Sequence, residues 1–120
     1  MARKQMTEVE KKEWISKCWV TWGDVGFGCR QYLCFHPSYT APIGTVFTTA
    51  MSDAAFVWHS FVLPWARRRG VRTHIHEQMA KHFKVISTGV GSKDGGRQFL
   101  IATGFKRDHV RKDWYWVRTS

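Results

Sequence analysis

Apolar residues near the start of the chain recur at helical intervals and predict a first helix. Thr7 and Glu10 have the spacing of a capping box, in which two side chains bind backbone N–H groups at the start of a helix. The apolar residues that follow at positions i, i+3, i+4 and i+7 are Ile15, Cys18, Trp19 and Trp22. We therefore expect a helix from about residue 7 to residue 21.

A group of β-strands is expected next. The segment 23–28 (GDVGFG) is expected to be a loop, because its glycines favour turns. Three runs rich in aromatic and β-preferring residues follow it, at 29–36, 43–51 and 54–63. Short connections join these runs, so we expect the three strands to pair antiparallel.

The pattern of the second half alternates between helix and strand. Pro64 ends the third strand, and apolar residues at near-helical spacing predict an amphipathic helix from Gly70 to about Phe83. The elements expected after it are a strand at 84–90, a turn at 91–96, a helix at 97–105 that Gly104 stops, and a strand at 113–118. This order, α-β-β-β-α-β-α-β, predicts one α+β domain over residues 1–120 with a strand–helix–strand crossover in its middle.

The composition adds a bulky core and an uneven charge. Seven tryptophans and eight phenylalanines in 120 residues provide enough apolar area for a packed globular domain. The net charge is +10, and residues 61–120 hold thirteen lysines and arginines against four acids. Such asymmetry predicts an anionic partner, whether a phosphate-bearing cofactor, a nucleic acid or an acidic surface. A basic face that only improves solubility is the alternative.

Several classes of protein do not fit the sequence. Cys18, Cys29 and Cys34 are an odd number without a CxxC pair, so we expect no disulfide framework and place the chain in the reducing cytoplasm. No segment has the roughly eighteen consecutive apolar residues of a membrane span. We expect no metal site, because His74 and His76 face different directions on a helix and no acid or cysteine completes a ligand set at recognisable spacing.

The segment 64–73 (PWARRRGVRT) joins an expected strand to an expected helix and has the features of a phosphate site. The first N–H groups of a helix have no partners within the helix, and the macrodipole adds about half a positive charge there. Flanking guanidinium groups bind phosphate in a bidentate way, and Gly70 lets the backbone approach the anion at little steric cost. The pattern therefore predicts a turn that can hold a phosphate group.

The same residues resemble the central signature of the Gcn5-related N-acetyltransferase (GNAT) family. In that family a strand ends in V-x-P, and the pyrophosphate loop after it reads Q/R-x-x-G-x-G/A. Val62 and Pro64 match the strand end, and Arg67 and Gly70 match the first two fixed places of the loop. Arg72 stands where the family usually has glycine or alanine, so its side chain must turn away from the coenzyme.

A second part of the resemblance lies downstream. The segment 97–105 (RQFLIATGF) is similar to the family's A-x-x-x-Y-x-x-x-G-F segment, with Gly104 and Phe105 in the closing places. Leu100 replaces the tyrosine that often protonates the departing coenzyme A thiolate in this family. The resemblance covers about residues 43–118, and the first strand usual in the family is expected to be absent or replaced by the first helix.

The resemblance implies an α+β fold of the GNAT type, in which a central mixed β-sheet is flanked by helices on both faces. It implies a strand–loop–helix pyrophosphate site at 67–73 and acetyl-coenzyme A as cosubstrate. It further implies transfer of the acetyl group to a primary amine of a small molecule or a protein, by a monomer or a homodimer. The residues implied in coenzyme binding are the backbone of Phe61, Val62 and Leu63 for the pantetheine arm, and Arg67, Arg68, Arg69, Gly70, Val71, Arg72 and Thr73 for the phosphates.

Two residues are candidates for proton transfer in such a reaction. The amine must be neutral before it attacks the thioester, which requires a general base. His59, on the strand before the loop, is the candidate base. By the period-two rule its side chain shares a strand face with Val57, Phe61 and Leu63, so packing in the core is an open alternative. Tyr115 on the last strand is the candidate acid in place of the missing tyrosine, and packing is again the alternative.

Two other functions stay open at this point. Basic residues alternate with aromatic ones in 105–118 (FKRDHVRKDWYWVR), as in proteins that bind single-stranded nucleic acid. Alternate residues of a strand face opposite sides, however, so Trp114, Tyr115 and Trp116 are not all exposed together. The second alternative is an inactive GNAT-like binding module, which Leu100 and Arg72 favour.

Overall fold

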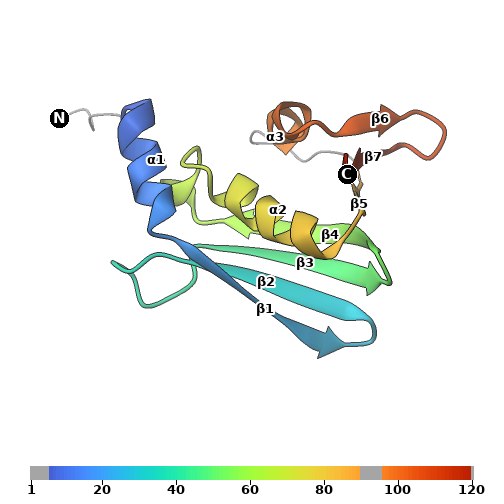
Figure 1. Ribbon diagram of the computed structural model, residues 1–120, viewed down its shortest axis with the longest axis horizontal. Helices are drawn as coiled ribbons and strands as arrows, with labels where there is room; N and C mark the ends of the chain where they lie inside the picture. The colour runs from blue at the N-terminus through green and yellow to red at the C-terminus, as the bar shows by residue number, and fades with distance from the viewer. Residues whose placement is uncertain (1–5, 90–95, 120) are drawn as a thin grey trace.

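The computed structural model describes residues 6–89 and 96–119 of the chain (Figure 1). The elements in chain order are α1 (Glu8–Ser16), β1 (Trp19–Gly26), β2 (Cys29–Phe35), β3 (Gly44–Met51), β4 (Ala54–Val62), the 3₁₀ turn η1 (Pro64–Ala66), α2 (Val71–His82), β5 (Val85–Thr88), α3 (Gly96–Thr103), β6 (Lys106–Asp108) and β7 (Asp113–Val117). The turn expected at 91–96 lies outside the described residues, apart from Gly96 at the start of α3.

All the strands belong to one mixed sheet in the order β1-β2-β3-β4-β5-β7-β6. β4 and β5 are parallel and are joined through α2, whereas every other neighbouring pair is antiparallel. The expected α+β class and the single strand–helix–strand crossover are therefore confirmed. β6 was not expected, because its three residues (KRD) are all charged and carry no apolar signal.

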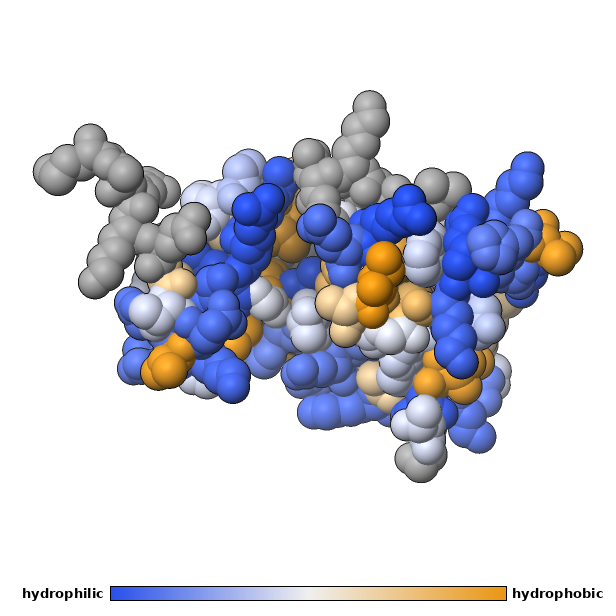
Figure 2. All heavy atoms as spheres, turned by 90° about the horizontal axis from the view of Figure 1, so that it is seen from above, coloured by the Kyte–Doolittle hydropathy of each residue, from blue (hydrophilic) through white to orange (hydrophobic). Residues whose placement is uncertain are grey.

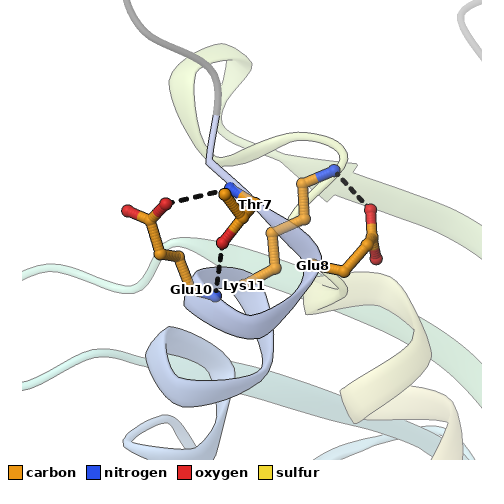
Figure 3. Close-up of polar contacts among 4 residues, drawn as sticks. All are labelled: Thr7, Glu8, Glu10 and Lys11. Atoms are coloured by element: carbon orange, nitrogen blue, oxygen red, sulfur yellow. Dashed lines mark hydrogen bonds and ion pairs between the residues drawn. The ribbon is translucent and has the colours of Figure 1, made fainter.

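The first helix starts where the sequence predicts. Thr7 Oγ1 accepts a hydrogen bond from the N–H of Glu10 at 3.1 Å, and Glu10 Oε1 accepts one from the N–H of Thr7 at 3.2 Å (Figure 3). One turn on, Lys11 Nζ lies 3.5 Å from Glu8 Oε1. The capping box is confirmed because both of its partners lie within four residues, where local geometry decides.

The expected length of this helix is wrong. α1 ends at Ser16, and the expected loop at 23–28 is the end of β1 and a tight turn. β1 forms a hairpin with β2, in register from Trp19 opposite Phe35 to Gly26 opposite Cys29. The spacing of the apolar residues in β1 is compatible with either a helix or a strand. The hydrogen bonds to β2 favour the strand. The sheet therefore has an edge strand where the sequence predicted the end of a helix and a loop.

Only one face of the sheet is covered within the described residues. α2 packs against β1, β2, β3 and β5, and α3 packs against α2. Figure 1 shows α1, α2 and α3 on the same side of the sheet. The core between helix and sheet includes Val71, Ile75 and Met79 from α2 and Tyr32, Val46, Val57 and Ile86 from the strands. The expected helices on both faces are wrong, because hairpins connect β1 to β4 and leave no segment there to cross to the other side.

The two faces differ in character. Seen from the helix side, the surface is largely hydrophilic with isolated apolar spots (Figure 2). The opposite face of the sheet exposes large apolar side chains, among them Trp19, Phe56, Trp58 and Phe61. None of the helices in the described ranges is long and apolar enough to cross a membrane.

Candidate functional site

The sheet opens along the second half of β4. Residues 54–57 of β4 pair with Val85–Thr88 of β5, and β5 ends there. From His59 to Val62, β4 pairs with β3 on one side, and no strand of the described residues pairs with it on the other. Main-chain groups on this side of β4 therefore have no partner strand within residues 6–89 and 96–119.

A β-bulge in β4 changes the direction of its side chains. Phe47 of β3 pairs with His59 and the next residue of β3 pairs with Val57, so Trp58 is an extra residue in β4. Val57 points into the core and is 4% exposed, whereas His59 is exposed on the open face. The expected common face of His59 and Val57 is therefore wrong, and so is the alternative of a core histidine. A single inserted residue reverses a period-two pattern.

Main-chain hydrogen bonds near the end of β4 show which groups line the gap. The N–H of Leu63 donates to Ile43 O at 3.0 Å, and its carbonyl accepts from the N–H of Ala66 at 2.8 Å, so the backbone of Leu63 is fully engaged. Main-chain groups alternate in direction along a strand, so those of Phe61 also face β3. The groups that face the gap belong to Ser60 and Val62, and Ser60 was not among the residues expected from the sequence.

The segment between β4 and α2 places backbone N–H groups at a helix start. Gly70 is the N-cap residue of α2 with φ +88°, a left-handed conformation that favours glycine. The first backbone bond of the helix runs from the N–H of His74 to Gly70 O at 2.9 Å. The N–H groups of Val71, Arg72 and Thr73 precede it and therefore have no partner within the helix.

A basic hollow of about 230 Å³ lies beside this helix start, between α1 and the loop. Its lining residues are Glu8, Lys11, Lys12, Ile15, Arg68, Arg69 and Gly70. The sequence did not reveal the two lysines as site residues, because they lie about sixty positions before the loop and only the packing of α1 brings them close. Ile15 of α1 would lie 3.7 Å from a Cβ atom at Gly70, an ordinary van der Waals distance, so α1 lies directly beside the loop.

The three arginines of the loop before α2 point in different directions. Arg67 turns back to β4, where its Nε donates to Val62 O at 3.1 Å and its guanidinium lies 5.7 Å from the Phe61 ring. Arg69 lies over Trp14 and Trp65, with its guanidinium 5.0 and 5.6 Å from the two ring centres. Arg68 is exposed with φ +64°.

Arg72 points away from the helix mouth toward α3. Its guanidinium lies 4.7 Å from the centre of the Phe99 ring, and its Nη1 has no hydrogen-bond partner among the described residues. Burial lowers the pKa of this group to about 10. The large side chain therefore leaves the space in front of the helix start clear, although its backbone N–H stays there.

Tyr115 and Leu100 have different environments. Tyr115 is half-buried on β7, opposite Ser87 of β5, and shares the open face of the sheet with His59. No hydrogen bond or ring contact joins Tyr115 to His59 among the described residues. Leu100 is 3% exposed in the core, so the position at which the GNAT family often has tyrosine is filled by apolar packing.

The neighbours of Tyr115 face the other way. Trp114 is 8% exposed, and the Trp116 ring lies 4.8 Å from the buried His76 ring. The three aromatic rings of β7 therefore do not form one platform for stacked bases, which removes the main structural support for single-stranded nucleic-acid binding.

Two histidines of α2 make contacts within the fold and do not face the helix start. His74 Nε2 lies 3.2 Å from Cys18 O, and His76 is buried against Phe99, Phe105 and Trp116. Burial, with a smaller effect from Arg72, lowers the pKa of His76 to about 4. Within residues 6–89 and 96–119, histidine, cysteine and acidic side chains form no group of three that could hold a metal ion.

A larger hollow of about 590 Å³ lies at the opposite end of α2. It is lined by residues of the β1–β2 hairpin, including Trp22, Asp24 and Arg30, and by His82 and Phe83. None of the expected site residues reaches it, so its size does not make it the site of the chemistry expected from the sequence.

Comparisons with known proteins find similarity in structure but none in sequence. No family model matches the chain, and no curated protein matches it in sequence. Among solved structures, YhhK from E. coli bound to coenzyme A is similar with TM-score 0.65 and 20% identity, over 79% of this chain and 76% of that one. A GNAT-family acetyltransferase from Staphylococcus aureus gives TM-score 0.63 and 13% identity over 75% and 68%. The aminoglycoside N-acetyltransferase AAC(6')-Iy in complex with CoA gives 0.55 and 16% over 68% and 71%.

Proposed function

Because the chain has the GNAT fold, we propose that it binds acetyl-coenzyme A and transfers the acetyl group to a primary amine. One observation carries this proposal. A helix start with unbonded N–H groups and a basic hollow directly follows a strand whose outer edge is open. This arrangement offers a phosphate site and a main-chain binding edge within one short segment of chain.

The helix start is the proposed site of the diphosphate. The N–H groups of Gly70, Val71, Arg72 and Thr73 point toward the anion, and the dipole of α2 adds to the attraction. Cations around the hollow offer further charge to the coenzyme's phosphates. They are Arg68 and Arg69 from the loop and Lys11 and Lys12 from α1.

The open edge of β4 is the proposed site of the pantetheine arm. In the structure Arg67 Nε donates a hydrogen bond to Val62 O, one of the main-chain groups on that edge, so Arg67 must leave before a ligand can bind this carbonyl. A phosphate is a stronger partner for a guanidinium than a carbonyl group, because the hydrogen bonds are then assisted by charge on both sides. We therefore expect Arg67 to move from Val62 to the diphosphate and to leave the carbonyl for a pantetheine amide.

The gap in the sheet lets the acceptor approach from the face opposite the helices. The amine nitrogen attacks the thioester carbon, the C–N bond forms, the C–S bond breaks, and coenzyme A leaves as the thiolate. His59 is placed to take the proton of the amine, because it is exposed on the unpaired half of β4. Tyr115 is the candidate donor of a proton to the thiolate, because it lies on the same face of the sheet.

The proposal is tested with acetyl-coenzyme A itself. We expect it to raise the melting temperature of the full chain and to give a saturable heat in calorimetry, and Gly70→Pro to abolish both because proline cannot adopt φ +88°. The double variant Lys12→Gln/Arg68→Gln removes two positive charges from the hollow without changing the backbone, and it is expected to weaken binding of acetyl-coenzyme A about tenfold. Lys84→Gln, a surface change at the other end of α2, is the control.

Three outcomes separate the alternatives. Binding accompanied by release of free thiol with an amine supports the proposed function. Binding without thiol release for any amine makes the chain a coenzyme-binding module, a result that the buried Leu100 favours. No binding of the coenzyme, together with salt-dependent binding of RNA or DNA, overturns the proposal.

A further inference from the structure

The open face of the sheet carries no formal charge on the strands next to the gap. Outward positions of β1 to β5 follow from the register, which places core residues such as Val46 and Val57 on the helix side. None of these outward positions holds Asp, Glu, Lys or Arg. They are Trp19, Thr21, Gly23, Cys29, Gln31, Leu33, Phe35, Thr45, Phe47, Thr49, Met51, Ala54, Phe56, Trp58, His59, Phe61, Val85 and Ser87. In a chain of net charge +10, the β1 to β5 positions of this face are uncharged and rich in aromatic rings. One cation, the Arg67 guanidinium, lies 5.7 Å from the Phe61 ring.

Aromatic rings surround the candidate base on this face. The Phe47 ring centre lies 5.2 Å from that of Trp58 and 5.8 Å from that of His59. Trp58 is 53% exposed and its ring is available to a ligand. Phe61 is 44% exposed, and its ring becomes available when the Arg67 guanidinium, 5.7 Å away, leaves it. Phe61 is two residues from His59 along the strand, or about 7 Å. A ligand of modest length therefore reaches the base and an exposed aromatic ring together.

We propose, on the basis of the function proposed above, that the acceptor is an arylalkylamine, an aromatic ring joined to a primary amine by a short chain, and that it binds on this face. An ammonium group is attracted to aromatic faces, and an aryl ring gains both buried area and offset stacking on Trp58 and Phe61. An acidic acceptor finds no cation on the β1 to β5 positions of this face, and a polycation finds no carboxylate there to pair with its further charges. The aromatic face therefore favours acceptors that carry an aromatic ring, and His59 requires that they also carry an amine.

The reaction on this acceptor is balanced without a further reagent. The ammonium form loses one proton to solvent, and the neutral nitrogen forms the new C–N bond as the C–S bond of acetyl-coenzyme A breaks. The second proton of the nitrogen passes to His59, which returns it to solvent. The thiolate takes up a proton from solvent, so one proton is released overall. Arg67 covers the Phe61 ring until the diphosphate withdraws it, so the acceptor is expected to bind after the coenzyme.

The experiment measures thiol release by the full chain at saturating acetyl-coenzyme A. We expect kcat/KM for phenethylamine to exceed that for ethylamine by at least about tenfold, because only the former has a ring to stack. Spermidine and glycine, a polycation and an amino acid with a carboxylate, are expected to be poorer still. Trp58→Ala is expected to reduce the preference for phenethylamine over ethylamine by about tenfold, mainly through KM.

Trp19→Ala is the matched control, because Trp19 is also exposed on this face but lies on β1, three strands away from β4. It is expected to leave the preference unchanged. Equal use of ethylamine and phenethylamine, or better use of spermidine, overturns the inference while leaving the proposed function intact. Failure to bind acetyl-coenzyme A at all is instead a failure of the proposed function.

Sedimentation of the same variants tests the other occupant of such a face, a second copy of this chain. A dimer that Trp19→Ala and Trp58→Ala both dissociate shows that the aromatic face is a subunit interface, and this result overturns the inference. A monomer that retains the ring preference supports it.

Discussion

Gly44→Ala is expected to push the start of α2, which carries the proposed phosphate site, slightly away from the sheet. Gly44 is the first residue of β3 and is buried under the start of α2. A Cβ atom at this position would lie 2.7 Å from Val71 Cγ1, whereas carbon atoms in contact prefer about 3.5–4.0 Å. The two next contacts, Ile75 Cδ1 at 3.5 Å and Phe61 O at 3.6 Å, are ordinary. The whole conflict therefore falls on Val71, the first residue of α2.

Val71 cannot relieve the overlap by rotation. A valine in a helix has one strongly preferred χ1 rotamer, and Val71 is buried. The start of α2 must therefore move away from the sheet by several tenths of an ångström to about 1 Å, which we expect to cost about 1–3 kcal/mol of unfolding free energy. The backbone entropy lost by glycine in a strand offsets up to about 1 kcal/mol of this cost. The same movement displaces the N–H groups of Val71, Arg72 and Thr73, so the affinity for acetyl-coenzyme A is expected to fall about tenfold.

The assay is urea unfolding followed by circular dichroism, with a matched control and a compensating change. Gly23→Ala places the same methyl group on β1, where no atom lies within 4 Å, and is expected to be neutral or slightly stabilising. Val71→Ala alone is expected to cost about 1–2 kcal/mol, but less in the Gly44→Ala background, because it removes the clashing Cγ1. The double-mutant cycle should show a coupling of about 1–2 kcal/mol.

The reasoning is refuted if the unfolding free energy of Gly44→Ala is higher than that of the natural chain, because the overlap with Val71 should outweigh the entropy gained by replacing glycine. Additive costs of Gly44→Ala and Val71→Ala would equally show that the two positions do not press on each other. The stability result does not depend on the proposed function, because it concerns only the packing of α2 on β3.

Two further predictions concern buried positions. Burial lowers the pKa of His76 from its ordinary 6.5 to about 4. The folded state therefore favours the neutral ring. Its contribution to the unfolding free energy is complete above about pH 6.5 and is lost as the pH falls toward 4. Between pH 7 and pH 5 this loss amounts to at most about 2 kcal/mol. His76→Phe, which keeps a ring between Phe99 and Trp116, is expected to remove most of it, as measured by urea unfolding at the two pH values. An unchanged pH dependence contradicts the assignment. Leu100→Tyr, which restores the tyrosine common in the GNAT family, is expected to cost about 1–3 kcal/mol without raising the rate of thiol release, because position 100 is packed in the core. A faster rate in this variant would show that the hydroxyl group reaches the thiolate.

The elements around the candidate site could be predicted from the sequence because their signals are local. The capping box at Thr7 and Glu10, the strand end at Pro64 and the glycine at the start of α2 each act within a few residues of chain. Backbone geometry at such positions is decided by steric limits and nearby hydrogen bonds, which the residue types specify. The unbonded N–H groups at Val71, Arg72 and Thr73 follow from the position of the helix start alone.

The remaining features depended on partners that are distant in the sequence. Pairing with β2 turned residues 19–26 into a strand, and the pairing of β4 with β3 inserted the bulge at Trp58 that placed His59 on the open face. The packing of α1 brought Lys11 and Lys12 to the loop, and α3 drew Arg72 away from it. Hydrophobic periodicity records which side chains are apolar, but it does not record which strand will supply their hydrogen bonds or which helix will cover them. Those choices are made by the free energy of the whole packed sheet, so only the tertiary structure decided them.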